Sequence, residues 1–461
     1  MIVMKFGGTS VGSADAIIRV RDIIQSRKAQ QPVVVTSAVG GVTNKLVALT
    51  KLAAEGNRAK ADTVIAEFIE THISLIAELE IDSDADLAAE IKTGTLMLND
   101  AIDAIFSAGQ LTKELYDSVI SMGEYFTANM LPAVLRAAGS PSQMVDSRSI
   151  LITDDNFSTA LPLYEISKNN AQAKLAALAA AGETPVLQGF IGNTKDGRTT
   201  TLGRGGSDYS ATLFGAMLDV EYVEIWSDVD GVLTADPSIV DDAHRIRYMS
   251  FQEAAELAYF GAKVLHPATL VPAVEHDFSV VVLNSMNPEF KGTTISAHHP
   301  IDPKLEGRVK SIAYKEDLTV ITVTSSRMLM AHGFMARLFA TFEKFETAID
   351  LVSTSEVTVS LTVDNTTNLN QIIGELEAIA TVQVEHQKAI VCLVGEGLKR
   401  TKGIPGQIFG LLQDTRIYSI SQGASEINLS FVIDEEHLPT VVTRLHSFFF
   451  NGDLDPHIFA I

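Results

Sequence analysis

The sequence predicts an α/β protein with a mostly parallel sheet covered by helices, followed by a repeated α+β region. Two observations support this. Up to about residue 295, short apolar strands rich in Val, Ile or Phe alternate with helical stretches. Beyond residue 307, one order of strand, helix and strand occurs twice. With 461 residues the chain can form two or three hydrophobic cores, so we do not expect a single domain.

The first region contains the strands that we expect in the parallel sheet. They are Ile2 to Phe6, Pro32 to Ser37, Gln143 to Asp146, Thr184 to Phe190, Glu221 to Trp226 and Ser279 to Leu283. Between Lys45 and Leu135 only Ala, Leu and Glu at helical spacing occur, which predicts a helical insertion over one end of the sheet. Asp196-Gly197 is a tight-turn signal and predicts a hairpin.

Residues 296–307, SAHHPIDPKLEG, read as a linker between a first domain (1–295) and the repeats. His298 and His299 lack partners at ligand spacing, so we expect no metal site there. The repeats form two βαββαβ-like units, 308–386 and 387–461, which are able to exchange strands. Their elements are Thr319 to Thr324, Gly333 to Lys344 and Val357 to Val363, then Ala389 to Val394, Gly406 to Leu412 and Glu426 to Ile433. A purely structural repeat is the alternative.

Composition excludes several classes of protein. The formal net charge of -22 argues against a general attraction to DNA, RNA or anionic lipid. Cys392 is the only cysteine, so no intrachain disulfide can form, and we interpret it as a core residue. No apolar run has the length of a membrane span and no signal-peptide pattern opens the chain, so we expect a cytoplasmic protein.

Two glycine loops follow the first two strands. Lys5-Phe6-Gly7-Gly8-Thr9-Ser10 opens a helix from about Ala14 to Ser26, and its glycines allow backbone N–H groups to approach phosphate oxygens beside the Lys5 charge. The P-loop and dinucleotide patterns are absent, and a simple turn is the alternative. Ser37 to Asn44 has the same order, which places a second helix N-terminus on the same rim of the sheet. Alternatively, Ser37 or Thr43 merely caps that helix.

The most informative stretch is TTTLGRGGSDYS, residues 199–210. Its glycines allow close backbone approach, Arg204 is able to neutralise phosphoryl charge, and Asp208 is able to orient a donor or a metal-bound water. An N-cap role for Asp208 is the alternative.

Three further positions are candidates for ligand contacts. Ser227 and Asp228 begin a turn after a strand that suits a nucleotide base and ribose; the turn lacks the distal ligands of a calcium loop. Lys263 is a candidate phosphate contact, or a lysine that complements a helix dipole. Glu124, on an apolar helical stretch, needs a cationic partner, which is either an α-ammonium group of a ligand or Arg148.

The first region resembles the aspartate kinases of the amino-acid kinase family. The resemblance rests on six motifs in order: KFGGTSV, SAVGGVTN, SMGEY, TTTLGRGGSDYSA, WSDVDGV and FGAKVLHPATL. The resemblance implies the three-layer fold of that family and transfer of the ATP γ-phosphoryl group, with Mg²⁺, to L-aspartate, giving 4-phospho-L-aspartate for lysine, threonine and methionine biosynthesis. It implies catalytic roles for Lys5 and Asp208. The implied aspartate contacts are Ser37, Thr43, Glu124, Arg204, Gly205 and Ser207. The implied nucleotide contacts are Lys5, Phe6, Gly7, Gly8, Ser10, Ser227, Asp228, Leu233, Lys263 and Val264. Leu233 and Ser238 stand where the family can have an aromatic residue and an arginine.

The repeats resemble the paired ACT domains of these kinases, which bind end-product amino acids. The resemblance favours lysine over threonine as effector. The matching positions are Met328, Ala331, Phe334, Met335, Ala348, Ile349, Asp350, Ser355 and Glu356, and Asp350 and Glu356 are able to meet a cationic effector. Ala331 and Ala348 stand where the lysine-responsive subgroup can use serine. We expect a homodimer or dimer of dimers and, because the sequence ends soon after the second repeat, no fused homoserine dehydrogenase domain.

Because the aspartate side chain is already a nucleophile at pH 7, the expected chemistry needs placement and charge neutralisation more than a general base. Two other hypotheses remain. In the first, the phosphoryl acceptor is not aspartate but glutamate, N-acetylglutamate, carbamate or a nucleoside monophosphate. In the second, the chain is a non-catalytic amino-acid sensor. Lys5, Arg204 and Asp208 argue against the sensor.

Overall fold

The computed structural model describes residues 1–261, 265–297, 307–326, 328, 332–423, 425–452 and 454–460. They form two compact units. The first comprises Met1–Val232, Arg247–Phe251 and Val264–His299, and the second comprises Leu233–Ile246, Gln252–Lys263 and Pro300–Ile461.

The first unit is built on an eight-stranded sheet in the order β10-β12-β11-β8-β1-β2-β5-β3. Neighbouring strands are parallel except β11 and β12. The strands are β1 (Ile2–Phe6), β2 (Pro32–Thr36), β3 (Ser142–Met144), β5 (Thr184–Gln188), β8 (Tyr222–Ser227), β10 (Tyr248–Met249), β11 (Ser279–Asn284) and β12 (Thr293–Ile295). All six strands expected from the sequence are therefore confirmed, with small differences at their ends.

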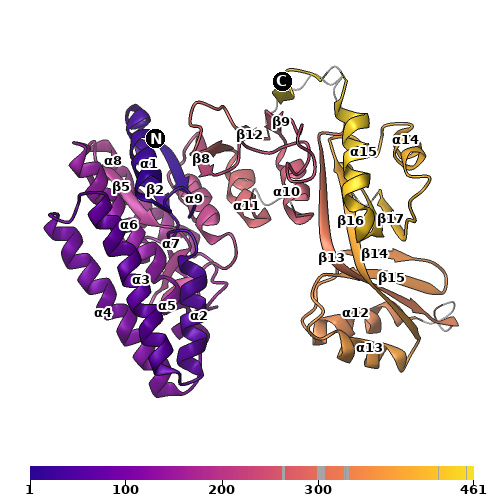
Figure 1. The fold of residues 1–461 in the computed structure, drawn as a ribbon, viewed down its shortest axis with the longest axis horizontal. Helices are drawn as coiled ribbons and strands as arrows, with labels where there is room; N and C mark the ends of the chain where they lie inside the picture. Colours follow the sequence, from indigo (N-terminus) through magenta and orange to yellow (C-terminus); the bar gives the residue numbers. More distant parts are fainter. Residues whose placement is uncertain are drawn as a thin grey trace. The chain divides into compact units, whose positions relative to one another are not determined.

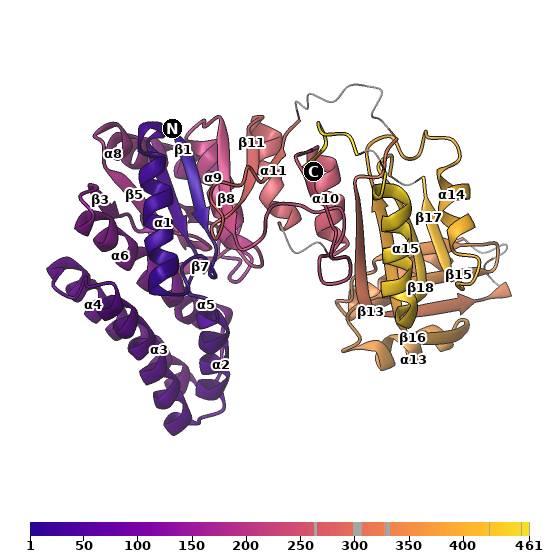
Figure 2. The same ribbon diagram turned by 45° about the horizontal axis from the view of Figure 1, so that its top comes forward.

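Helices cover this sheet, and those from Val42 to Ala137 confirm the predicted helical insertion. The insertion contains α2 (Val42–Ala54), α3 (Arg58–Glu78), α4 (Ala85–Ala108), α5 (Lys113–Ile120) and α6 (Met122–Ala137). Figures 1 and 2 show α3 and α4 extending beyond one end of the sheet. Every residue of α6 from Met122 to Leu135 is buried, so α6 lies between the sheet and the other helices of the insertion. The remaining helices of the unit are α1 (Ala14–Ser26), α7 (Tyr164–Ala171), α8 (Ala177–Ala180), α9 (Gly206–Met217) and α11 (Pro267–His276).

A small second sheet carries the chain toward α9. It joins β4 (Ile152–Thr153), β6 (Ile191–Thr194) and β7 (Thr199–Thr201) in the order β4-β6-β7. Strands β6 and β7 are antiparallel, and Gly197 has φ 92° in the turn between them. This confirms the hairpin predicted from Asp196-Gly197.

The register of the large sheet brings four loops to one rim. Phe6 lies opposite both Thr36 and Trp226, and Thr36 lies opposite Gln188. Since these residues stand at or next to the carboxyl ends of β1, β2, β5 and β8, the loops that follow those strands start at the same edge, where open α/β sheets bind ligands.

The second unit is built on a six-stranded antiparallel sheet in the order β14-β15-β13-β16-β18-β17. The long strands β13 (Ser311–Thr324) and β16 (Thr381–Val394) pair over their whole length, and each serves both repeats. The predicted boundary between residues 386 and 387 falls inside β16. The other elements are α12 (Phe334–Lys344), β14 (Leu351–Thr354), β15 (Thr358–Val363), α13 (Leu369–Glu377), α14 (Ile404–Leu411), β17 (Ser419–Gln422), β18 (Asn428–Asp434) and α15 (Leu438–Phe450). In Figures 1 and 2, α13 and α15 lie against opposite ends of the long strands.

The equivalence of the repeats differs in one detail from the sequence prediction. Helix α14 begins at Ile404 after Gly403, which has φ 88°, as α12 begins at Phe334 after Gly333, which has φ 85°. The helix start predicted at Gly406 is wrong by two residues. Gly403 is the true counterpart of Gly333, because both supply the left-handed backbone that starts the helix.

The second unit also takes two segments that the sequence analysis placed in the first domain. Strand β9 (Arg245–Ile246) pairs with β19 (Phe459–Ala460), near the end of the chain. Helix α10 (Phe251–Tyr259) carries Glu253, whose Oε2 lies 2.7 Å from Lys310 Nζ with both side chains buried. These contacts join residues that lie on opposite sides of the predicted linker. Most of the predicted linker, residues 298–306, lies outside the described residues.

Within the part of the chain that the structure describes, no helix combines the length and the apolar character needed to cross a membrane.

Candidate active site

A pocket of about 540 Å³ opens at the rim where the strands of the large sheet end. It brings together eight residues that the sequence analysis proposed: Lys5, Ser37, Thr43, Glu124, Arg204, Gly205, Ser207 and Asp208. The other lining residues are Tyr116, Ile120, Ser158, Phe190, Thr201, Gly203 and Gly206. Residues from β1, the loop after β2, the helical insertion and the segment that leads into α9 therefore meet in one cavity.

Lys5 and Asp208 form an ion pair on the wall of this pocket. The Lys5 ammonium nitrogen lies 2.5 Å from Asp208 Oδ1, and the two side chains are 9% and 17% exposed. Lys5 comes from the end of β1 and Asp208 from the first turn of α9. The carboxylate holds the Lys5 side chain in place, so a cationic group is fixed at the rim of the sheet.

The loops after β1 and β2 touch through glycine backbone. Gly40 N donates to Gly8 O at 3.1 Å, and a Cβ at Gly8 would lie 2.9 Å from Ala38 O. Any side chain at Gly8 would push the loops apart, so glycine is required for this close approach.

Helices α2 and α9 start at the pocket with glycine at the N-cap. Gly41 has φ 82° and Gly205 has φ 73°, and neither helix has a side-chain cap. The interpretations of Ser37, Thr43 and Asp208 as N-caps are therefore wrong. Both helices instead leave first-turn N–H groups for a ligand, which favours phosphate or carboxylate oxygens.

Glu124 on α6 is a buried lining residue of the pocket, with 4% of its surface exposed. Burial raises the pKa of Glu124 to about 7, while hydrogen bonds from backbone and the charge of Lys5 oppose this shift. Its Oε2 has no hydrogen-bond partner among the described residues. A buried carboxylate oxygen without a partner is costly, so this site is set up to receive a cation.

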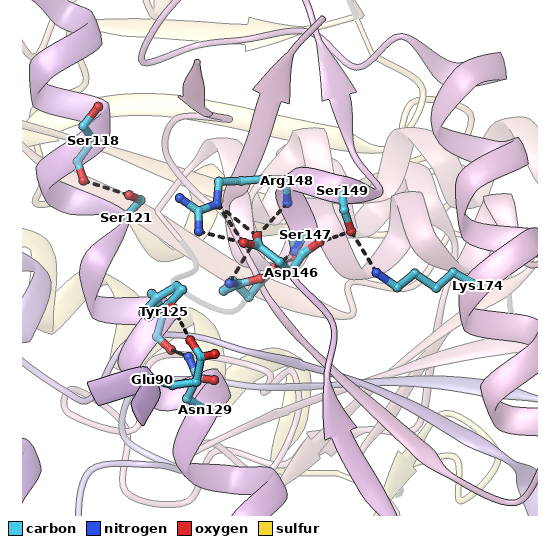
Figure 3. Close-up of polar contacts among 11 residues, drawn as sticks. Glu90, Ser118, Ser121, Tyr125, Asn129, Asp146, Ser147, Arg148, Ser149 and Lys174 are labelled. Carbon is cyan, nitrogen blue, oxygen red and sulfur yellow. Dashed lines mark hydrogen bonds and ion pairs between the residues drawn. The ribbon is translucent and has the colours of Figure 1, made fainter. Parts of the chain in front are cut away.

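The alternative partner for Glu124 is engaged elsewhere. Figure 3 shows the Arg148 guanidinium facing the Asp146 carboxylate, with Nη2 2.6 Å from Oδ2. The guanidinium carbon of Arg148 also lies 5.5 Å from the ring centroid of Tyr125, whose hydroxyl donates to Glu90. The pairing of Glu124 with Arg148 considered from the sequence is therefore wrong.

Asp117 on α5 fixes two residues of the pocket wall from behind. It is fully buried and accepts four hydrogen bonds from Ser158 and Thr201. Burial raises the pKa of Asp117, and the four hydrogen bonds oppose that shift. Nothing in the sequence singled out Asp117 or Ser158, because a lone carboxylate in a helix and a serine in a loop match no motif.

The expected nucleotide contacts, unlike the expected aspartate contacts, do not gather in one pocket. Phe6 is fully buried and stacks on Trp226, so its side chain belongs to the core. Ser10 Oγ lies 2.7 Å from Ser285 Oγ, and Ser285 donates to Ser227 O at 3.0 Å, which ties the first glycine loop to the end of β8. Gly7, Gly8 and Ser10 follow β1, Ser227 ends β8 and Asp228 follows it. None of these five residues lines the pocket. Leu233 belongs to the second unit, and Lys263 and Val264 lie outside the described residues.

The expected effector residues lie in the first repeat of the second unit. Phe334 is in the hydrophobic core, and Met328, Met335 and Ile349 pack against that core. Ala348, Ser355 and Glu356 are exposed, and Ala331 lies outside the described residues. Asp350 Oδ1 lies 2.6 Å from Lys315 Nζ, so the cation that meets Asp350 in this structure is internal.

The fold and this pocket define a phosphotransferase class. The model of the Amino acid kinase family matches residues 1–284, and an ACT domain model matches residues 391–449. "Lysine-sensitive aspartokinase 3" of Escherichia coli is 38% identical, covering 97% of this chain and 98% of that protein. "Aspartokinase 3, chloroplastic" of Arabidopsis thaliana is 36% identical, covering 98% of this chain and 82% of that protein.

Solved structures agree with the sequence relatives. The crystal structure of E. coli aspartokinase III in complex with aspartate and ADP superposes with a TM-score of 0.84 at 36% identity, covering 98% of this chain and all of that chain. The same enzyme in complex with lysine and aspartate gives a TM-score of 0.82. The chain belongs to the amino acid kinase family and, within it, to the aspartokinases with ACT regulatory domains.

Proposed function

We propose that the pocket binds L-aspartate beside the terminal phosphate of ATP and catalyses ATP + L-aspartate → ADP + 4-phospho-L-aspartate. The observation that carries this proposal is the meeting of Lys5, Asp208, Arg204 and the unpartnered Glu124 oxygen in one cavity. The cations suit phosphate and carboxylate groups, and Glu124 suits an α-ammonium group.

In the proposed reaction the side-chain carboxylate of aspartate attacks the γ-phosphorus in line with the departing ADP oxygen. Arg204 and the first turn of α9 hold the carboxylates of aspartate, and Glu124 holds its ammonium. Lys5, positioned by Asp208, neutralises charge on the transferring phosphoryl group. No general base is required, because the carboxylate is ionised at pH 7.

Mg²⁺ is the expected companion of ATP, and it supplies charge neutralisation on the phosphates. Among the described residues, no group of three or more His, Cys, Asp or Glu side chains is placed to hold a metal ion. This fits a Mg²⁺ ion held mainly by phosphates and water, with one or two carboxylates from the protein. Asp208 is the carboxylate beside the phosphate-facing lysine and would orient a metal-bound water.

Lys5→Ala tests the proposed centre. We expect kcat to fall at least about a hundredfold, because the ammonium acts on charge that develops in the transition state, while the melting temperature changes little. Lys92→Ala removes an exposed lysine from α4 and should leave kcat unchanged. Near-normal turnover in Lys5→Ala would remove Lys5 from the mechanism.

An acceptor panel separates the proposed reaction from related ones. Purified protein is assayed with ATP, Mg²⁺ and, in turn, aspartate, glutamate, N-acetylglutamate, carbamate and a nucleoside monophosphate. We expect turnover with aspartate, measured as aspartyl hydroxamate. If another acceptor is phosphorylated and aspartate is not, the assignment to aspartate is wrong. If no acceptor is phosphorylated, the result favours a non-catalytic sensor.

For the regulatory unit we propose lysine as the effector. The Oδ2 atom of Asp350 is buried without a hydrogen-bond partner among the described residues, and Glu356 is exposed nearby in sequence, which favours a cationic ligand. The hydroxamate assay is repeated with lysine, threonine and methionine, and lysine should inhibit most strongly. Inhibition by threonine alone would overturn this choice.

We also propose a homodimer or a dimer of dimers. Val352 and Ile420 occupy the second position of the two edge strands β14 and β17, and they are 38% and 46% exposed. Exposed apolar residues on edge strands favour contact with a second copy. A monomer by light scattering that retains full regulation would refute this proposal.

A further inference from the structure

The four hydrogen bonds to Asp117 are divided between its two oxygens according to the kind of donor. Oδ2 accepts from the backbone N–H groups of Ser158 and Thr201, at 2.7 and 2.9 Å. Oδ1 accepts from the Ser158 and Thr201 hydroxyls, both at 2.9 Å. Two backbone donors on one oxygen and two hydroxyls on the other satisfy an ionised carboxylate on both sides.

This arrangement fixes the hydrogen-bonding polarity of the pocket wall. A hydroxyl has one hydrogen, and in both residues that hydrogen is donated to Asp117. Whatever reaches these oxygens from the pocket must therefore donate a hydrogen bond. Thr201 is fully buried, whereas Ser158 is partly exposed and lines the pocket, so Ser158 Oγ is the accessible acceptor.

Ser158 is held in a backbone conformation that a serine rarely adopts. Its φ is 71°, in the left-handed region that favours glycine. Asp117 binds both the N–H group and the hydroxyl of this residue, which stabilises the conformation and directs the side chain. A strained residue that lines a pocket and is held in place by hydrogen bonds to a buried neighbour is typical of ligand sites.

The charges of the pocket indicate which ligand group meets this acceptor. Lys5 and Arg204 are donors that suit carboxylate and phosphate oxygens, and Glu124 presents an unpartnered carboxylate oxygen. L-Aspartate carries two carboxylates and one strong donor, its α-ammonium group. We infer that Ser158 Oγ accepts a hydrogen bond from the substrate's α-ammonium group, with Glu124 as counter-charge, and that Asp117 is the positioning residue that gives Ser158 this polarity.

This inference rests on the proposed function, and its experiment tests it separately. Turnover of aspartate by the unaltered protein is measured first, and its absence would refute the proposed function before any variant is made. Ser158→Ala and Ser158→Gly are then compared with Thr159→Ala, an exposed neighbour in the same loop that does not line the pocket. Ser158→Gly also relieves the backbone strain at φ 71°. The melting temperature of each variant is measured to separate a loss of affinity from a weakened fold.

We expect both Ser158 variants to raise KM for aspartate roughly tenfold, as for a lost hydrogen bond to a charged group. The values of kcat, KM for ATP and all constants of Thr159→Ala should stay within about twofold of the unaltered protein. Inhibition by succinate, which has both carboxylates but no ammonium, should be unchanged. An equal weakening of succinate, or an effect on ATP in place of aspartate, would overturn the assignment to the ammonium.

Asp117→Asn tests the positioning role. Asparagine fits the same space with its oxygen toward the two N–H groups, but its NH₂ then donates to the hydroxyls and turns their hydrogens outward. KM for aspartate should rise at least as much as in Ser158→Ala, with succinate unaffected. Adding Asp117→Asn to Ser158→Ala should change KM for aspartate little further, because Asp117 acts through Ser158. Additive effects, or unchanged KM in Asp117→Asn, would contradict the positioning role.

Discussion

At the residue scale, Glu124 links substrate binding to pH. Its pKa is about 7 in the ligand-free protein because it is buried, and only the ionised form pairs with an ammonium group. We therefore expect KM for aspartate to fall as pH rises from 6 to 8, whereas Glu124→Gln should bind aspartate weakly at every pH. Steady-state kinetics across this range will measure the effect, and a KM of the unaltered protein that does not change with pH would contradict it.

The same shift predicts an effect on stability with a definite sign. The folded-state pKa of about 7 lies above the unfolded value of 4.5, so folding binds a proton between these pH values. The free energy of unfolding should therefore decrease by up to about 3 kcal/mol from Glu124 as pH rises from 4.5 through 7. Glu124→Gln should make the ligand-free protein more stable at pH 8. Chemical denaturation at pH 5 and pH 8 will compare the two proteins.

Residues differed in how well the sequence predicted them. Lys5, Arg204 and Asp208 stand in or beside glycine loops whose backbone requirements leave a local pattern, so the sequence alone proposed them. Asp117 and Ser158 lie 41 residues apart and meet only in the folded protein. Their roles depend on a hydrogen-bond geometry and on a positive φ at Ser158, neither of which a sequence pattern encodes.

At the element scale, α9 depends on the glycine at its start. A Cβ at Gly205 would lie 2.4 Å from His266 Cβ, and its φ is 73°. Gly205→Ala should displace the N-terminus of α9 and with it Asp208, lowering kcat/KM by about a hundredfold or more. Gly182→Ala is the matched control, because φ there is 82° but no atom lies within 4 Å. Equal activity in the two variants would contradict the requirement for glycine at position 205.

Helix α3 contains a buried histidine that should make the helical insertion sensitive to acid. Burial lowers the pKa of His72 to about 4, and its Nδ1–H donates to Phe68 O at 2.8 Å. Because the folded pKa lies below the unfolded value of 6.5, stability is lost as pH falls from 6.5 to 4, by up to about 3 kcal/mol.

His72→Leu should remove most of this pH dependence, measured as hydrogen exchange of α3 amides at pH 7 and pH 4.5. His437→Gln, which changes a histidine that is 45% exposed, should leave the exchange of α3 unchanged. If α3 of His72→Leu still opens on acidification as in the unaltered protein, the source of acid sensitivity lies elsewhere.

Element types were predictable because strand and helix periodicity is local. Strands β1, β2, β5, β8 and β11 were placed correctly, and so was the helical insertion. The start of α14 was missed because Gly403 and Gly406 are both consistent with a helix start, and only the positive φ of Gly403 distinguishes them.

At the scale of the whole molecule, the buried pair of Glu253 and Lys310 holds α10 to the residue directly before β13 in the second unit. Glu253 Oε1 also accepts from Glu396 N at 2.8 Å. Glu253→Gln leaves the Lys310 charge buried without a counter-charge and should destabilise the second unit by about 3–5 kcal/mol. Glu375→Gln breaks the exposed pair with Lys344 and should cost less than about 1 kcal/mol. Denaturation that shows no difference between the variants would refute this prediction.

The division into units was the least predictable feature. A linear reading placed one boundary near residue 296, but residues 233–246 and 252–263 join the second unit through contacts with residues far along the chain, such as Lys310 and Phe459. Long-range pairing of this kind has no local signal, because the polar and apolar patterns of α10 and β9 do not say which core they will join.

This interleaving has a practical consequence for protein engineering. The chain passes between the units several times, so no single cut separates a catalytic fragment from a regulatory one. A fragment that stops at residue 296 keeps α10 and β9 but lacks their partners Lys310 and Phe459, and it should be poorly soluble in bacterial expression. A feedback-resistant enzyme should therefore be sought through single substitutions rather than by deletion.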